Sequence, residues 1–448
     1  MTTISQSTVI TQKYISEYTG PFTIDTPDVV ISFGSEIEVV NGISFIISAD
    51  NVTIDGCNNE VIFNYSSDED WSGFIRNGAW ATKSTGTAWI ADTNQTNGHN
   101  NCIVRNMNIT MLKSHDATPG EAVTRRFVFG HYYGLNANNN VIENIHVRIP
   151  DATNSISALP NHPIFIGAYL ACVSDDANTA SVDISNCTIT GLSTINYIIH
   201  GVLMSKGCGN VLSSGGIIHP IGDAHYTNNI VYPSNGNYSN SSINITNCHV
   251  TAARGSYIHC NHTAKYGAGI IVGDFAGGTI RLNNCSAENF YEDKLNGILW
   301  VYVQDAGGMI IGPFAYADIS MNDCHGRYVG YDHYNYFYDH RGVSLIGNSF
   351  NGILNVNNCS HYSHACSFKG GIVGARSGDR EQNTIINVEN TVFNGQVIMG
   401  SGGIIGPFCD ASAVTIQRCS VRVVINDNID NSNRGDNRSN YSRTSNTN

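Results

Sequence analysis

The sequence has little charge. Charged residues make up 13% of its 448 positions, where about a quarter is usual for a globular domain. The charge that is present leans acidic, with 36 Asp and Glu against 23 Lys and Arg and a formal net charge of -13. An acidic surface repels phosphate backbones, and no run of Lys or Arg offers a local exception, so nucleic acid is not an expected partner.

Targeting and membrane signals are also missing. Residues 1–20 show neither a basic segment nor the apolar stretch of a secretory signal. No stretch approaches the roughly 18 apolar residues of a membrane helix. We therefore expect a chain that is made in the cytoplasm without a signal peptide and is not inserted into a membrane.

Motifs for metals and cofactors are absent as well. The 13 cysteines contain no CxxC pair and no zinc-type spacing with histidine. A Walker loop, a dinucleotide fingerprint and a GxSxG elbow are lacking too. We expect no cofactor and no metal site, and a chain this long does not need a disulfide scaffold.

What the sequence does contain is a repeat, in which two apolar residues at alternate positions precede an Asn-like residue and then Cys. The clearest copies end at Asn186-Cys187, Asn247-Cys248, Asn284-Cys285 and Asn358-Cys359. Variants end at Asp323-Cys324, Asn390-Thr391 and Arg418-Cys419, and weaker copies at Gly56-Cys57, Asn106-Met107 and Asn144-Ile145. The alternation predicts a strand with one buried face. The Cys breaks it, which predicts a bend with Asn at the corner and Cys stacked in the core as a small hydrophobe.

A second unit, with glycines bracketing two or three apolar residues, precedes the first. Gly273, Gly312 and Gly347 each lie 12 residues before the corner cysteine that follows. Equal spacing in unlike sequence indicates a fixed geometric unit, in which glycine allows either positive φ or close stacking. Aromatic residues follow the unit and predict an aromatic stack, at Phe275, Phe314 and Phe408.

A third apolar segment, such as residues 298–303, completes the repeat. Three short strands joined by turns predict one coil of a right-handed parallel β-helix, an all-β solenoid. We expect a single domain over residues 1–425, with initial coils at 1–63 and the clearest repeats at 160–420. Loop excursions are expected at 64–100, 222–242 and 328–341, followed by a polar, flexible tail at 426–448.

The Gly unit followed by the Asn-Cys unit resembles the GLUG-type repeats of bacterial surface adhesins, over roughly residues 160–420. The segments 22–24, 29–31 and 52–56 resemble the first coils of pectate-lyase-like β-helices. The Asn-rich style is similar to that of β-helix proteins from giant DNA viruses of amoebae. These resemblances imply a β-helix fold but say little about function.

The run from 331 to 341 is the best local candidate for a binding site, because it combines tyrosines with two Asp-His pairs. Its candidate residues are Asp332, His333, Tyr334, Tyr336, Tyr338, Asp339, His340 and Arg341. Tyrosine rings stack on sugars while Asp, His and Arg fix hydroxyl groups, which favours a glycan-binding loop. Two alternatives stay open: a metal site, if histidines and a carboxylate converge, or a loop that packs its tyrosines on the helix wall.

Two functions follow from these observations. The first is a non-catalytic structural or surface β-helix, associated with a virion as a fibre, spike or capsid component, with glycan binding as a further property. Its partners would be other structural proteins or copies of the chain, for example in a trimer. The second is a polysaccharide lyase or glycoside hydrolase with a groove along the β-helix. Of the pectinase-type signatures only Asp175-Asp176 occurs, in a turn-like context, and no catalytic residue can be named.

Overall fold

A computed structural model of the chain describes residues 2–18, 20–40, 42–63, 74–78, 81–83, 89–91, 97–111, 126–129, 133–134, 136–148, 166–167, 180–192, 204–206, 217–218, 242–252, 271–276, 278–290, 308–311, 314–315, 317–329, 344–347, 349–350, 352–367, 371–374, 384–399, 403–406, 409 and 411–425. In these residues the protein is almost entirely β-structure, and the single helix is α1 (Gln12–Glu17). The described chain has no helix of the length and apolar character needed to cross a membrane.

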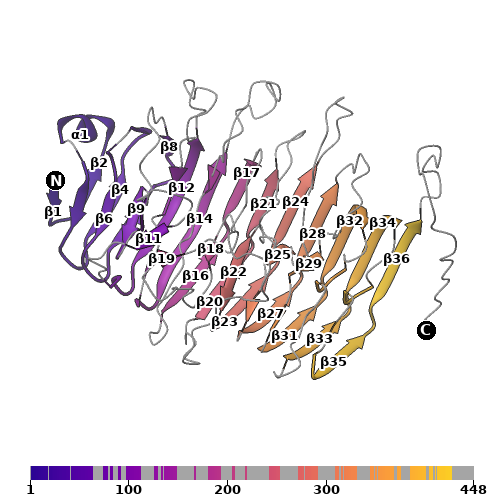
Figure 1. The fold of residues 1–448 in the computed structure, drawn as a ribbon. Coiled ribbons are helices and arrows are strands. Elements are labelled where there is room, and N and C mark those ends of the chain that lie inside the picture. Colours follow the sequence, from indigo (N-terminus) through magenta and orange to yellow (C-terminus); the bar gives the residue numbers. More distant parts are fainter. Residues whose placement is uncertain are drawn as a thin grey trace.

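Two ribbons of parallel strands follow the length of the molecule, and the first and last strands, β1 (Thr2–Ile4) and β36 (Ser420–Ile425), lie at its opposite ends (Figure 1). Ribbon A runs through β2 (Thr8–Ile10), β4 (Val30–Phe33), β7 (Thr53–Asp55), β12 (Ile103–Met111), β14 (Asn140–Arg148), β16 (Ser181–Ser185), β20 (Ser242–Thr246), β23 (Thr279–Asn283), β27 (Asp318–Asn322), β31 (Gly352–Asn357), β33 (Thr384–Glu389) and β35 (Ala413–Gln417).

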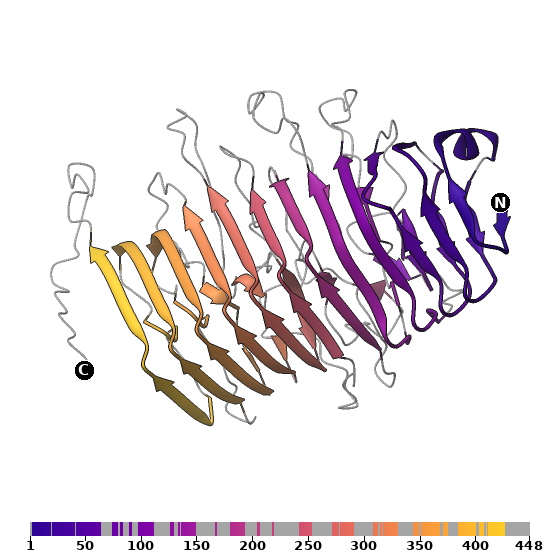
Figure 2. The same ribbon diagram turned by 180° about the vertical axis from the view of Figure 1, so that it is seen from behind.

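From β4 onward, ribbon B contains the strand that follows each short strand of ribbon A, and the long strands β12 and β14 contribute their second halves to it. Its other members are β5 (Ile37–Val39), β8 (Glu60–Phe63), β17 (Thr188–Leu192), β21 (His249–Ala252), β24 (Ser286–Phe290), β28 (His325–Val329), β32 (Ser360–Ser367), β34 (Val392–Met399) and β36 (Ser420–Ile425). Seen from behind, the strands of both ribbons lie side by side (Figure 2).

Shorter strands form further parallel sheets. One contains β1 (Thr2–Ile4), β3 (Phe22–Ile24), β6 (Phe45–Ile47) and β9 (Ile75–Asn77). Another contains β18 (Met204–Lys206), β22 (Val272–Ala276), β25 (Gly308–Ile311), β26 (Phe314–Ala315), β29 (Ser344–Ile346) and β30 (Ser349–Phe350). Strands β13 (Arg126–Phe127) and β15 (Ile166–Gly167) pair in parallel, whereas β10 (Ala81–Lys83), β11 (Trp89–Ala91) and β19 (Ile217–Ile218) are antiparallel.

The core consists of columns of apolar side chains that stay in register from strand to strand. One column of ribbon A takes an Ile, Leu, Met or Val from every strand between β4 and β33, all of them at most 2% exposed. Its members are Ile31, Ile54, Val104, Ile142, Ile184, Ile245, Leu282, Met321, Val356 and Val388. A shift of register by one residue would turn each strand's apolar side chains to the solvent, so the columns fix the pairing.

The predicted corner is confirmed. The residue between the two ribbons has a left-handed φ, between 49° and 56°, in every repeat from Asn106 to Arg418. Asparagine adopts this conformation more readily than most residues, because its short polar side chain forms local hydrogen bonds. The recurrence of Asn at this position therefore has a backbone cause.

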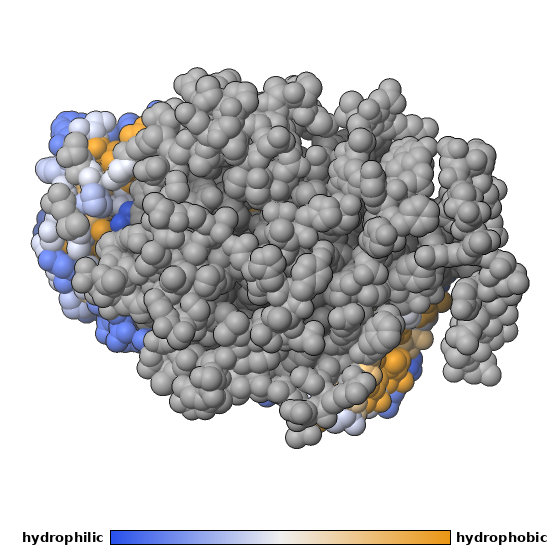
Figure 3. All heavy atoms as spheres, in the orientation of Figure 1, coloured by the Kyte–Doolittle hydropathy of each residue, from blue (hydrophilic) through white to orange (hydrophobic). Residues whose placement is uncertain are grey.

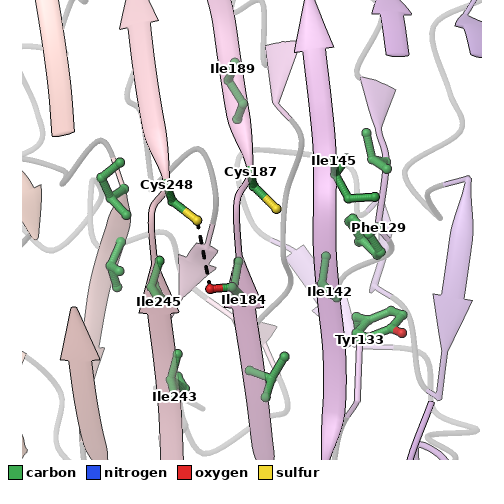
Figure 4. Packing of buried hydrophobic residues seen from close by; sticks show 14 of the residues in the cluster. Phe129, Tyr133, Ile142, Ile145, Ile184, Cys187, Ile189, Ile243, Ile245 and Cys248 are labelled. Carbon is green, nitrogen blue, oxygen red and sulfur yellow. Dashed lines mark hydrogen bonds between the residues drawn. The ribbon is translucent and has the colours of Figure 1, made fainter. Parts of the chain in front are cut away.

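The predicted stack of thiols is confirmed for the five successive corner cysteines from Cys187 to Cys359, all at most 2% exposed. Each thiol also donates to the backbone carbonyl two residues earlier, as Cys285 does to Asn283 over 3.4 Å. Thr391 takes the same position in a later repeat and donates to the carbonyl of Glu389 over 2.7 Å. In the repeats from Cys187 to Thr391 the position thus holds a small side chain that donates a hydrogen bond, whereas Met107 and Ile145 occupy it in the two preceding repeats. The thiols of Cys187 and Cys248 point into the core (Figure 4).

The copy at Gly56-Cys57 departs from the prediction, because Cys57 is exposed. Asp55 pairs with Arg105 and Glu60 pairs with Asn108, so this corner contains two more residues than the one in β12. The extra residues form a turn that carries Cys57 away from the core. The excursion expected at 64–100 is also wrong in part, because β9 continues the parallel stack on β6.

Close stacking accounts for one glycine of the unit, Gly371, but not for Gly403, where an added Cβ would meet nothing within 4 Å. A Cβ on Gly371 would lie 2.1 Å from the carbonyl oxygen of Gly403, and the φ of Gly371 is not positive. Of the predicted aromatic stack, Phe275 and Phe314 are direct neighbours on paired strands, and Phe408 lies outside the described residues.

The two ends of the stack differ. At the N-terminal end α1 covers the core, with Ile15 buried and the ring of Tyr14 5.7 Å from that of Phe22. At the other end the inward-facing Val414 and Ile416 of β35 are 45% and 47% exposed. Apolar atoms are visible at this end in Figure 3. The described strands therefore end with an open apolar layer.

Candidate functional site

The site predicted from the sequence, residues 332–341, lies outside the described residues. The same holds for the pair Asp175-Asp176. The search for a site therefore moves to the outward faces of ribbons A and B, where side chains from successive strands form columns.

Ribbon B carries an outward column in which imidazoles and hydroxyls alternate from strand to strand. We name it the histidine strip; its members are His146, Thr188, His249, Ser286, His325 and Ser360. Each strip residue directly follows the buried residue after a corner, so its side chain points outward by strand alternation. The strip places one imidazole on every second strand.

Each imidazole of the strip accepts or donates a hydrogen bond through Nδ1 with the hydroxyl on the following strand. The distances are 2.9 Å from His146 to Thr188, 2.8 Å from His249 to Ser286 and 2.9 Å from His325 to Ser360. This bond fixes the orientation of the ring and leaves Nε2 as the other polar atom. His146 and His325 are exposed and His249 is half-buried.

A second outward column runs beside the strip, two residues further along each strand. It consists of Arg148, Thr190, Thr251, Glu288, Arg327 and Tyr362. The guanidinium of Arg327 lies 5.8 Å from the ring centroid of Tyr362, a cation–π distance. The guanidinium of Arg148 reaches Glu60 over 3.7 Å and Thr110 over 3.4 Å. The column therefore combines two cations, hydroxyls, an aromatic ring and the carboxylate of Glu288.

The two ribbons differ in charge among the described outward residues of their strands from β7 onward. Ribbon A carries five carboxylates and two arginines, namely Asp55, Glu143, Asp183, Asp318 and Glu389 with Arg105 and Arg281. Ribbon B carries two carboxylates and three arginines, namely Glu60 and Glu288 with Arg148, Arg327 and Arg422, besides the three strip histidines. Ribbon A is thus the acidic face of a chain with net charge -13, whereas the three arginines of ribbon B are matched by three carboxylates when Glu38 of β5 is counted.

On ribbon A the nearest approach to a charged site is Asp55 with Arg105 and Glu143. The Nε of Arg105 lies 2.7 Å from Asp55 Oδ2, and its Nη1 lies 4.0 Å from Glu143 Oε1. Burial acts to raise the pKa of Asp55, but hydrogen bonds from the Cys57 N–H, Arg105 and Asn106 outweigh it and lower the pKa. The carboxylate is held ionised and paired, which suits a structural tie across strands better than proton transfer.

The strip differs from the Ser-His-Asp arrangement of hydrolases. In a Ser-His-Asp arrangement the serine hydroxyl forms a hydrogen bond with one imidazole nitrogen, and a carboxylate accepts a hydrogen bond from the other nitrogen and so orients the ring. Here the hydroxyls occupy Nδ1, and the three pairs repeat the same geometry instead of converging on one point. Among the described residues, no three His, Cys, Asp or Glu side chains are grouped closely enough to hold a metal ion. The face is suited to binding through hydrogen bonds and charge.

One further histidine, His361, lies in the core and is not part of the strip. It is 0% exposed, its Nδ1 lies 3.2 Å from the carbonyl oxygen of Gly326, and its ring stacks on Phe393 at 5.7 Å. Gly326 is its neighbour on the adjacent strand, so the missing side chain there leaves room for the ring. His361 is a core residue with a satisfied hydrogen bond.

Reasoning from the sequence missed the histidine strip. A signal was present, because the residue after each corner cysteine is Thr188, His249, Ser286, His325 or Ser360. The alternation becomes meaningful only when the strands are known to lie in register.

Comparison of the chain with protein-family models, with curated proteins and with solved structures found no match.

Proposed function

We propose that the chain is a right-handed parallel β-helix with three strands per coil, and that it serves as a non-catalytic structural or surface protein. The in-register columns and the repeated left-handed corner support this architecture. A right-handed path is the expected one, because connections between parallel strands of one sheet are right-handed in nearly all proteins.

The proposed function rests on the contacts that the recurring corner asparagines and cysteines make. Corner asparagines hydrogen-bond to one another along the stack, and the thiols donate to backbone carbonyls inside it. The Asn and Cys side chains that recur at the corners of the described repeats are thus engaged in stacking. The proposed setting is a virion, where the protein would be a fibre, spike or capsid component alongside other structural proteins or its own copies.

Two measurements test the proposal. Mass spectrometry of purified particles should find the chain as a component. Incubation of the full chain with a panel of polysaccharides should release neither reducing ends nor unsaturated sugars. Release that is lost in Asp339→Asn would instead establish the polysaccharide-degrading alternative, because that substitution removes a carboxylate of the 331–341 run while keeping its size.

A further inference from the structure

We propose that the histidine strip, with the outward column beside it, is the binding face for an acidic polysaccharide that carries one anionic group on every second sugar. This inference concerns a site on ribbon B, and it stands whether or not the protein is part of a virion. It rests on three features: the spacing of the imidazoles, the charge of the face and the mixture of groups in its two columns.

The spacing is set by the sheet. Neighbouring strands lie about 4.7–4.9 Å apart, and the imidazoles of His249 and His325 are separated by one intervening strand, β24. Cations can therefore recur at about 9–10 Å along the strip, with a hydroxyl between them. Each sugar of an extended polysaccharide lengthens the chain by about the distance between two neighbouring strands. An anion on alternate sugars would thus meet successive histidines.

The charge of the face favours an anionic partner. Arg148 and Arg327 flank the strip, while ribbon A is acidic over the same strands. A protonated imidazole is a cation, so each strip histidine that holds a proton adds a positive charge to the face. The charged and titratable groups of the surrounding strands are Glu60, Arg148, Glu288, Arg327 and Tyr362, besides the strip histidines themselves. The two carboxylates offset the two arginines, so a net positive charge comes from the histidines.

The remaining groups favour sugar over other anions. Hydroxyl side chains at Thr188, Ser286 and Thr190 can exchange hydrogen bonds with sugar hydroxyls, and the ring of Tyr362 offers an apolar face. Nucleic acid has a much denser array of charges, whose binding depends on many Lys and Arg contacts with phosphate. Two arginines beside the strip on a chain of net charge -13 do not provide them.

The test measures binding of hyaluronan oligosaccharides, which carry a carboxylate on alternate sugars, to the full-length chain at pH 5.5 and 7.5 and constant ionic strength. We expect binding that is tighter at pH 5.5, and none of neutral dextran. The double variant His249→Gln/His325→Gln should bind about tenfold more weakly at pH 5.5 and lose most of the pH dependence. The matched control is Arg281→Gln on ribbon A, which should bind as the wild type does.

Several outcomes would overturn the proposal: no hyaluronan binding, equal binding of dextran, an unaffected double variant, or equal loss in Arg281→Gln. If duplex DNA or poly-glutamate competes as effectively as hyaluronan does, the strip binds anions without selectivity and the proposal is wrong. If the double variant does not fold, the wild type decides the question. Hyaluronan should then protect His249 and His325 from modification by diethyl pyrocarbonate, and unprotected histidines would contradict the inference.

Discussion

Asn247 donates a hydrogen bond from Nδ2 to Oδ1 of Asn186 over 3.1 Å, although 61 residues separate them in the chain. Asn284 continues the ladder by donating to Asn247 over 2.8 Å. All three residues have positive φ. The corner asparagine therefore has two roles: it adopts a left-handed backbone, and its amide links one repeat to the next.

Substitutions at Asn247 can separate these roles. Asn247→Gly keeps a residue that adopts positive φ easily and loses the amide ladder, which we expect to cost about 1 kcal/mol. Asn247→Ala loses the ladder and also strains the backbone, for a total of about 2–3 kcal/mol. Chemical denaturation of each variant measures the difference in the free energy of unfolding.

The control is Asn355→Ala. Asn355 accepts a hydrogen bond from Asn387 over 2.9 Å but lies inside a strand, so alanine there costs only the bond. Equal stability of Asn247→Gly and Asn247→Ala would show that the left-handed corner imposes no constraint.

The hydrogen bond from each corner thiol leads to a second prediction, at Cys324, whose thiol donates to the carbonyl of Asn322 over 3.3 Å. Cys324→Ala should destabilise the protein by about 1 kcal/mol, because a small cavity forms and the carbonyl of Asn322 keeps only the backbone N–H of Asn284 as a donor. Cys324→Ser keeps a donor of similar size and should cost less. Thermal unfolding measures both, and Cys57→Ala, at an exposed cysteine, should leave the midpoint unchanged. Alanine that is better tolerated than serine would mean that the position selects only for size.

The repeat explains why much of the fold could be predicted. Inward columns and corners recur with a regular sequence signature, so Cys285 could be placed in the core and Asn284 at the corner. The extra turn at Cys57 could not be predicted from the sequence. The two additional residues of this corner become evident only from the strand register, in which Asp55 pairs with Arg105 and Glu60 pairs with Asn108. Outward residues such as His249 obey no hydrophobic period, so their alignment into a strip depends on which strands are neighbours.

Thiol reactivity gives a third prediction. Burial raises the pKa of Cys102 to about 11, and a hydrogen bond with Cys187 together with burial raises the pKa of Cys248. Alkylation requires the thiolate and access to it. Iodoacetamide at pH 8 should therefore label Cys57 in the native protein, while Cys102 and Cys248 react only after unfolding.

Mass spectrometry of the digested protein locates the labelled residues. The denatured chain is the control and should be labelled at all of these positions. Labelling of native Cys248 at the rate of Cys57 would contradict a closed thiol stack.

The tie between Asp55 and Arg105 predicts a dependence of stability on pH. Asp55 is 14% exposed in its side chain, and its Oδ1 accepts from the Cys57 N–H over 2.8 Å and from Asn106 over 3.1 Å. The pKa of Asp55 is lower in the folded protein than in the unfolded chain, where the pKa of an aspartate is about 3.9. The folded state thus binds the proton less well, and the carboxylate stabilises the protein fully above that ordinary value. The contribution is lost as the pH falls through the lowered pKa of the folded state.

Asp55→Asn should therefore be less stable than the wild type by on the order of 1–2 kcal/mol at pH 7, because a neutral amide pairs poorly with Arg105. The gap should narrow as the pH falls below about 4, where Asp55 takes up a proton in the unfolded chain but not yet in the folded protein. Unfolding free energies at a series of pH values measure the gap, with Asp25→Asn at an exposed carboxylate as the control that shows little difference at either pH. A gap that stays constant from pH 7 to pH 3 would show that Asp55 acts through its shape alone and that its charge is not what holds the two strands together.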